Sequence, residues 1–123
     1  MINKVLAIAI AGAIGAISRY GLTSFIQRFF PSGFPGGTLV VNIIGCFLLG
    51  FIASVGLEKF ASPTIRIAVI VGLLGSFTTF STFGFDTVSL MRDGQEIKAL
   101  LNILLSVGLG LIAAWLGMLA AKS

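Results

Sequence analysis

Apolar residues fill four long stretches of the chain, and polar or helix-breaking residues separate them. A helix needs about 20 mainly apolar residues to cross the hydrocarbon layer of a membrane, and each stretch reaches that length. The pattern predicts an all-α integral membrane protein with one domain over residues 1–123 and four transmembrane helices, at about 4–27, 38–57, 65–90 and 97–121. The connections between these helices are too short to hold a soluble domain.

Helix-breaking residues mark the connections. Residues 29–37 contain two Pro and three Gly and are expected to form a loop, Ser62 and Pro63 open the third stretch, and residues 92–96 form the next turn. The first stretch imitates a signal peptide, with Lys4, an apolar run and small residues at 11–13. We interpret it as a retained span, because apolar residues continue beyond that point and the other spans would need it for packing.

A polar run interrupts the third stretch. Residues 75–83 read Gly-Ser-Phe-Thr-Thr-Phe-Ser-Thr-Phe, with five hydroxyl side chains among three phenyl rings. Hydrocarbon cannot satisfy free backbone or hydroxyl groups, so such a run survives only against protein or water. The pattern predicts a third helix that is broken in the middle, a pathway or binding site there, and carbonyl groups freed near Gly75. A ligand would meet neutral dipoles and ring edges, because the run has no ionisable side chain.

Composition narrows the class of protein. The chain is 57% hydrophobic and 10% charged, with one Cys, no His and four acidic residues, whereas a soluble domain has about 25% charged residues. The acidic residues are scattered, which predicts neither a transition-metal site nor a hydrolytic site and therefore no enzyme. The eight basic residues do not cluster, so they are interpreted as anchors at the ends of spans and not as a nucleic-acid surface.

Basic residues are almost evenly divided between the two sides of the membrane. One side holds Lys4, Lys59, Arg66 and Lys122, and the other holds Arg28, Arg92 and Lys98, or four if Arg19 is counted. An excess of Lys and Arg on the cytoplasmic side normally sets orientation. Either another feature orients this chain, or chains insert both ways and pair as an antiparallel homodimer about an axis in the membrane plane. Four helices leave little room for an aqueous path, so a pore is expected between subunits.

Polar residues in the second and fourth spans have two interpretations each. Asn42 lies within the second span, where its amide could join helices or donate to an anion. Asn102, Ser106 and Gly110 are spaced by four residues and share one face of the fourth helix. That face could either pack against another helix or line a pore.

The aromatic and charged residues near the polar run also have two interpretations each. Phe80 and Phe83 lie on one helical face, where they could be core residues or could turn their positive ring edges toward an anion. Arg19 could extend to the interface or provide a structural or vestibule charge. Asp86 could be an ordinary acid at a span end or a partner for a Lys or Arg.

Three segments carry a family resemblance. These are Gly-Ala-Ile-Gly-Ala-Ile-Ser-Arg-Tyr at 12–20, Gly-Thr-Leu-Val-Val-Asn-Ile-Ile-Gly-Cys-Phe at 37–47, and Gly-Leu-Leu-Gly-Ser-Phe-Thr-Thr-Phe-Ser-Thr-Phe at 72–83. They closely resemble the signatures of the Fluc (CrcB-type) fluoride channel family, in order and over essentially the whole chain. Asn102 and Asp86 depart from the Tyr and Glu that often occupy these positions in the family.

The resemblance implies a fluoride-selective channel that exports fluoride passively and relieves its toxicity. It implies a multi-pass protein of a prokaryotic plasma (inner) membrane, assembled as a dual-topology homodimer with two pores and a structural Na⁺ at the dimer centre. The pore residues that the resemblance implies are Asn42, Phe80, Phe83, Ser81 and Thr82, with Arg19 at the vestibule and the carbonyl groups of Gly75 and Thr78 on Na⁺. Asn102 and Ser106 are added to the predicted pore residues because of their shared face on the fourth helix.

The residues alone also allow a second function. A proton-coupled or exchanging small-anion transporter would need a titratable group in the middle of the membrane. Asp86 is the one acidic residue near the polar run.

Overall fold

Four membrane-length helical rods make up the protein. The computed structural model describes residues 1–56, 59 and 61–122. Its helices are α1 (Ile2–Gln27), α2 (Gly36–Ser54), α3 (Pro63–Ile67), the π-helix η2 (Ala68–Leu74), α4 (Gly75–Phe77), α5 (Phe80–Arg92) and α6 (Glu96–Lys122). The segments from α3 to α5 follow one another along the third rod. The four rods are long and apolar enough to cross a membrane, which confirms the four predicted spans.

The second span begins earlier than the sequence predicts. Gly36 and Gly37 were expected in the loop, yet they form the first turn of α2, directly after Pro35. Both glycines are buried, and a Cβ atom on either would collide, at Gly36 with the ring of Phe30 and at Gly37 with the backbone of Thr23. Their place in the helix therefore comes from close packing against the end of α1 and the loop, which overrides their low helix propensity. The predicted end of this span, Leu57, lies outside the described residues, as does Glu58.

The third rod begins as its sequence indicates. Ser62 caps it, because its Oγ accepts a hydrogen bond from Ile65 N–H at 3.2 Å, and Pro63 occupies the first helical position. The rod then continues through η2, a wider helical form that hydropathy does not predict.

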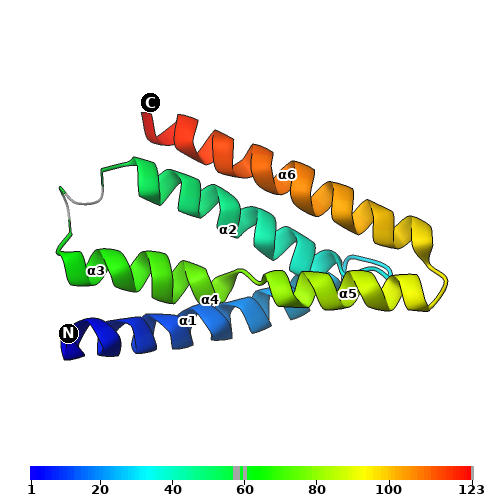
Figure 1. The fold of residues 1–123 in the computed structure, drawn as a ribbon, viewed down its shortest axis with the longest axis horizontal. Helices are drawn as coiled ribbons and strands as arrows, with labels where there is room; N and C mark the ends of the chain where they lie inside the picture. Colours follow the sequence, from blue (N-terminus) through cyan, green and yellow to red (C-terminus); the bar gives the residue numbers. More distant parts are fainter. Residues whose placement is uncertain (57–58, 60, 123) are drawn as a thin grey trace.

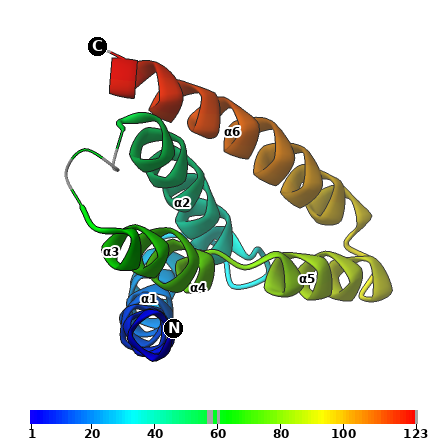
Figure 2. The ribbon, with the colours of Figure 1, turned by 60° about the vertical axis from the view of Figure 1, so that its left-hand side comes forward.

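The rods run alternately up and down, so both termini lie at one end of the molecule (Figure 1). Helix α1 packs against η2 and α4, while α2 packs mainly against α6. Seen from another side, α5 extends away from α1 and approaches α6, with which it shares a tight turn (Figure 2). That turn contains Gly94, whose φ of 77° suits glycine.

Small residues let the helix backbones approach closely at both main contacts. A Cβ atom at Gly15 would collide with the carbonyl of Leu73, and one at Gly72 would lie 2.8 Å from the carbonyl oxygen of Ile8. At the contact of α2 with α6, Cβ atoms on Gly50 and Gly117 would strike the facing backbone in the same way. Such contacts are typical of helices that associate in membranes.

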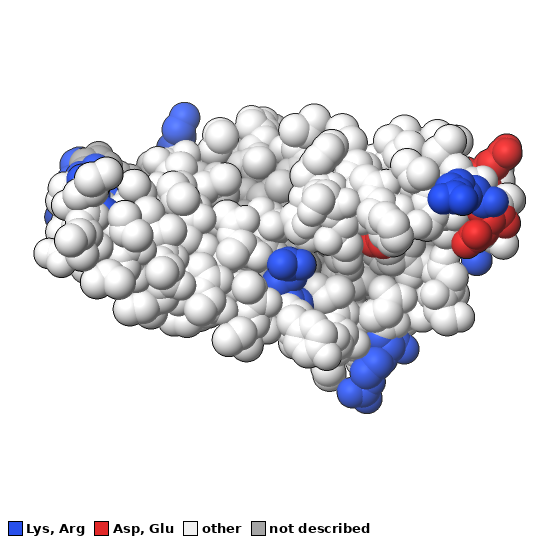
Figure 3. Space-filling model, turned by 60° about the horizontal axis from the view of Figure 1, so that its bottom comes forward, with Lys and Arg blue, Asp and Glu red and all other residues white. Residues whose placement is uncertain are grey.

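The surface is largely apolar along the length of the rods. Ile17 is 71% exposed and Leu111 is 68% exposed. Charged side chains gather at the two ends, and isolated charged side chains interrupt the uncharged surface nearer the middle (Figure 3). A surface of this kind suits contact with lipid or with another subunit.

Candidate functional site

The helical hydrogen bonding of the third rod is interrupted at two residues. Helix α4 ends at Phe77 and α5 begins at Phe80. Thr78 has φ −94° and ψ 157°, and Thr79 has φ −150° and ψ 119°, so both have extended backbones. An interruption leaves N–H and C=O groups without their helical partners, and in a low-dielectric setting each of them needs a replacement.

Asn42 supplies two of these replacements. Its Nδ2 donates to the carbonyl oxygen of Thr79 at 3.0 Å, and its Oδ1 accepts from the Thr79 N–H at 2.9 Å. One side-chain amide on α2 therefore pairs with both polar backbone groups of one residue in the break. A primary amide carries two N–H donors, and this pairing uses one of them, so the other has capacity for a further acceptor.

Thr79 also begins the second half of the rod. Its Oγ1 accepts from the Thr82 N–H at 3.2 Å, which is the N-cap of α5. The same oxygen lies 3.1 Å from the Thr82 hydroxyl and 3.2 Å from the Ser81 hydroxyl. The predicted hydroxyl residues Ser81 and Thr82 are thus gathered around Thr79, a residue that the sequence placed in the run but did not single out.

Two carbonyl groups lose their helical donors through these bonds. In a continuous helix the Thr79 N–H would bond to the carbonyl of Gly75, and the Thr82 N–H would bond to the carbonyl of Thr78. The Thr79 N–H donates to Asn42 instead, and the Thr82 N–H donates to the Thr79 hydroxyl. The carbonyls of Gly75 and Thr78 are the two that the family resemblance implies as ligands of a cation.

Arg19 contacts the same segment from α1. Its Nε donates to the carbonyl oxygen of Ser76 at 2.9 Å, and the Ser76 hydroxyl in turn donates to the carbonyl oxygen of Gly12 at 2.8 Å. The contact joins α1 to the last turn before the break. Arg19 also lines a small cavity of about 230 Å³ with Thr38 and Thr82.

A cavity of about 260 Å³ lies beside the break and is bounded by α2, the third rod and α6. Its described lining has no charged side chain and consists of Asn42, Gly45, Cys46, Leu49, Leu74, Thr78, Thr79, Phe80, Phe83, Ser106 and Val107. The rings of Phe80 and Phe83 are 5.6 Å apart between centroids and tilted by 50°. Phe80 is 82% exposed in the protomer, so it is not a core residue of this chain.

The fourth helix contributes a second polar cluster. Asn102 is 2% exposed, and its Nδ2 donates to the Thr87 hydroxyl at 3.0 Å, which donates to the carbonyl oxygen of Phe83 at 2.7 Å. The Ser106 hydroxyl donates to Asn102 Oδ1 at 3.4 Å, and Ser106 lines the cavity. Of the two predicted residues on this face, Ser106 reaches the cavity and Asn102 joins α6 to α5. Thr87 was missed, because a single Thr in an apolar span carries no periodic signal.

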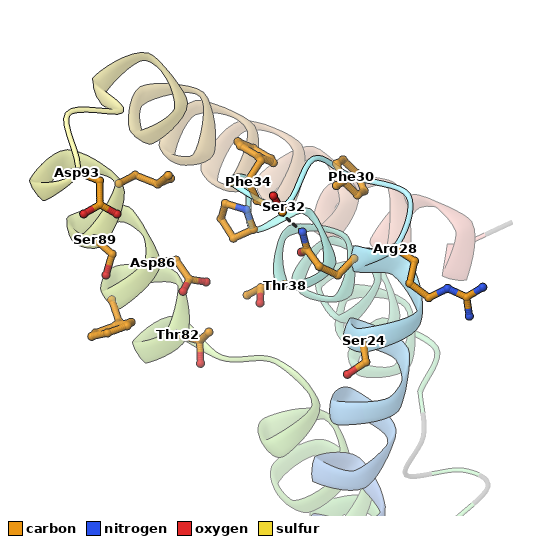
Figure 4. Close-up of a pocket in the computed structure, with 15 residues that line it drawn as sticks. Ser24, Arg28, Phe30, Ser32, Phe34, Thr38, Thr82, Asp86, Ser89 and Asp93 are labelled. Atoms are coloured by element: carbon orange, nitrogen blue, oxygen red, sulfur yellow. Dashed lines mark hydrogen bonds between the residues drawn. The ribbon is translucent and has the colours of Figure 1, made fainter.

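A larger cavity of about 810 Å³ opens at the end of the molecule opposite the termini. Figure 4 shows Asp86 pointing from α5 toward Thr38, with Thr82 beside them, while Arg28 points away on the far side. The loop at its rim is held by Gln27, whose Nε2 donates to the Phe34 carbonyl oxygen at 2.6 Å. Gln27 Oε1 accepts from the Gly37 N–H at 2.9 Å. Sequence reasoning missed this role of Gln27.

The fold and the site define a class: a small multi-pass membrane protein in which a polar break in the third span lies beside an uncharged cavity. The sequence model of the family described as CrcB-like protein, Camphor Resistance (CrcB), matches residues 6–118. The chain therefore belongs to this family, and the resemblance that its motifs indicated is confirmed.

Similar proteins carry a more specific name. A protein of Shewanella halifaxensis named fluoride-specific ion channel FluC is 45% identical over 115 residues, which cover 94% of this chain and 93% of that protein. Proteins of the same name from Geobacter sulfurreducens and Citrifermentans bemidjiense are each 44% identical, over 98% of both chains and 94% of both chains respectively.

Proposed function

We propose that this protein is a fluoride-selective channel that lets fluoride leave a prokaryotic cell passively across the plasma membrane. Family membership and the names of the relatives support this function and not an enzymatic one. The observation that carries the proposal is the pairing of Asn42 with the extended backbone of Thr79 at the wall of an uncharged cavity.

The chemistry of the cavity suits a small, strongly hydrated anion. Fluoride gives up water only where other donors replace it, and the second N–H of Asn42 provides such a donor. The Ser106 hydroxyl lines the same cavity and would add a second donor by turning its O–H from Asn102 Oδ1 toward the ion. The edges of the Phe80 and Phe83 rings add weak positive electrostatic contacts. Conduction needs binding that is strong enough for entry and weak enough for release, and donors without a fixed cation meet that need.

A transporter coupled to protons is the alternative function. It needs a titratable group on the anion path. Asp86 lies at the cavity near the end of the molecule, with Ser89 and Asp93 nearby, and not among the residues that line the cavity at the break. The arrangement favours a channel.

Liposomes that contain the purified protein test this proposal. Fluoride movement driven by a K⁺ gradient and valinomycin should exceed about 10³ ions per second per protein, above the turnover range common for enzymes. The rate should not depend on a pH gradient, and chloride in place of fluoride should give little flux. A saturable rate of a few ions per second that follows the pH gradient would instead establish the transporter.

We further propose that the channel is an antiparallel homodimer with two pores. The nearly even division of basic residues supports insertion in both orientations. Two features of the protomer support a partner at the break: Phe80 is 82% exposed, and a Cβ atom at Gly75 would meet nothing closer than 3.8 Å among the residues that the structure describes. Glycine at 75 therefore leaves room for something outside the protomer.

Dual insertion has a direct test. A reporter fused to the C-terminus should label both sides of the membrane in the natural protein. Three Lys residues added to the turn at 92–96 should fix one orientation, because they create a clear charge excess, and should abolish fluoride flux when this variant is expressed alone. A reporter signal from one side of the membrane in the natural protein would contradict dual insertion.

The broken third span fits a structural Na⁺ held by backbone oxygens. The carbonyls of Gly75 and Thr78 have lost their helical donors, and oxygen ligands suit hard cations. A bound cation would supply positive charge that stabilises these carbonyls, and we propose Na⁺ in this role at the dimer centre.

Removal of Na⁺ tests the cation site. Exhaustive exchange of Na⁺ for a large organic cation should lower both the stability of the dimer and the fluoride flux, and returning Na⁺ should restore them. If neither quantity changes, the carbonyls of Gly75 and Thr78 do not hold the ion.

A further inference from the structure

A third cavity, of about 390 Å³, lies at the end of the molecule that carries both termini. Helix α2 contributes Ile52 and Ala53 to its wall, and the third rod contributes Pro63, Arg66, Ile67, Ile70 and Val71. Arg66 is the one charged residue in this described lining. Its lining shares no residue with the cavity at the break, whose Leu49 and Leu74 lie one helical turn from Ile52 and Val71.

Arg66 has an unusual electrostatic environment. Its Nε–H is buried and has no hydrogen-bond partner in the part of the chain that the structure describes. Burial of a charged donor without a partner is costly, and the apolar wall offers water too few partners to replace one. Arg19 provides a contrast, because its Nε donates to the Ser76 carbonyl oxygen. The buried Nε–H is covered by the chain's own atoms, so a ligand in the cavity would meet the terminal nitrogens of the guanidinium. Their positive charge and N–H donors suit a ligand that accepts hydrogen bonds and carries negative charge.

The position of Arg66 identifies the kind of ligand. Arg66 lies in the first turns of the third span, four residues after the N-cap Ser62, and therefore near the level of the lipid headgroups. Lys4, Lys59 and Lys122 belong to the same end by topology and add positive charge there. The side chains beside it, Ile65 and Val71, are 54% and 53% exposed, so the outer surface around the cavity is apolar. A ligand here meets a cation at one end and hydrocarbon along its length.

We infer that this cavity binds an anionic phospholipid, with the lipid phosphate on the Arg66 guanidinium and an acyl chain along Ile67, Ile70 and Val71. A phosphate oxygen is a strong, charge-assisted acceptor for the planar donors of Arg. The apolar wall makes a free phosphate ion a poor ligand, because most of the wall would leave its oxygens unsolvated. The assignment rests on the cavity and on Arg66 and does not depend on the fluoride proposal.

Lipid retention by the purified, full-length protein in detergent micelles tests this site. Dioleoyl phosphatidylglycerol and dioleoyl phosphatidylcholine are offered in equal amounts, and the bound lipids are counted by native mass spectrometry. Wild type should retain the phosphatidylglycerol preferentially. Arg66→Gln keeps most of the side-chain length but loses the charge, and should weaken that retention about tenfold or more. Lys122→Gln, at the same end but outside the cavity lining, is the matched control and should change retention less than about twofold.

A second variant keeps the test independent of the folding of Arg66→Gln. Ala53→Phe adds a ring to the cavity from α2 without changing any charge, and should also displace phosphatidylglycerol. Wild-type retention in Arg66→Gln or in Ala53→Phe would overturn the site. Equal retention of phosphatidylcholine by wild type would show an apolar groove without headgroup recognition, and competition by millimolar inorganic phosphate would show a site for free phosphate; both results would overturn the assignment.

Discussion

Asn42 and Asn102 are the same residue type in two apolar spans, yet they have different structural roles. Asn42 pairs through both amide atoms with the backbone of Thr79, in a segment that is not helical. Asn102 donates to the side chain of Thr87, and both of these residues belong to intact helices. Asn42 is half-buried beside a cavity, whereas Asn102 is 2% exposed.

The comparison separates a polar residue that completes a broken backbone from one that joins two helices. The Thr79 backbone groups depend on Asn42, because no helical turn satisfies them. The Thr87 hydroxyl does not depend on Asn102, because it donates to the Phe83 carbonyl oxygen in any case. A buried amide is therefore a functional candidate when its partner is otherwise unpaired backbone, and mainly helix packing when its partner already has another bond.

The largest expected effect follows from a charge at position 42. Asn42→Asp removes the N–H donors and sets a carboxylate against both the Thr79 carbonyl and the anion. Two like charges at about 4 Å repel by about 4 kcal/mol at an effective dielectric constant of about 20, so fluoride flux should fall about thousandfold. Asn42→Ser, which keeps a neutral donor, should lose less of the fluoride flux than Asn42→Asp. Flux per folded dimer is measured in liposomes, and wild-type flux in Asn42→Asp would show that Asn42 only packs.

Stability should distinguish the two asparagines when each becomes Leu, which has the same branched shape and the same number of side-chain heavy atoms. Asn42→Leu leaves both the N–H and the C=O of Thr79 unpaired and should lower the free energy of unfolding by about 2 to 3 kcal/mol. Asn102→Leu leaves the Thr87 hydroxyl with its bond to Phe83 and should lower it by about 1 kcal/mol or less. Unfolding in mixed micelles measures both. Equal losses would remove the distinction between the two clusters.

The smallest expected effect concerns the phenyl rings at the break. Phe80→Ile and Phe83→Ile keep apolar bulk but remove the ring edge, whose contacts are worth about 0.5 to 1.5 kcal/mol, so each should lower flux about two- to tenfold. The dimer should still assemble, as size exclusion would show.

Phe77→Ile is the matched control for these two variants. Phe77 belongs to the same polar run but is 8% exposed, within the core. Its replacement should lower stability and leave the flux of each folded channel near that of wild type. Normal flux in both Phe80→Ile and Phe83→Ile would exclude a role for the ring edges.

Much of the architecture could be predicted because it depends on local composition. The lengths of the apolar stretches predict four spans, and the hydroxyl run at 75–83 indicates where regular helix is hard to maintain in hydrocarbon. Ser62 and Pro63 predict the start of the third rod, since capping acts within a single turn. Gly36 and Gly37 were wrongly predicted to lie in the loop, because two glycines after a proline are typical of a loop unless their packing partners are known.

The sequence by itself thus determined the class of protein, the number of spans and the location of the polar segment, all of which follow from hydropathy and spacing along the chain. Only the tertiary structure decided that Asn42 meets Thr79, that Thr87 meets Asn102, and which carbonyls lose their donors. These pairs are 37 and 15 residues apart. Which side chain reaches which backbone group depends on the faces that helices present to one another, and here close glycine contacts and the π-helical segment set those faces.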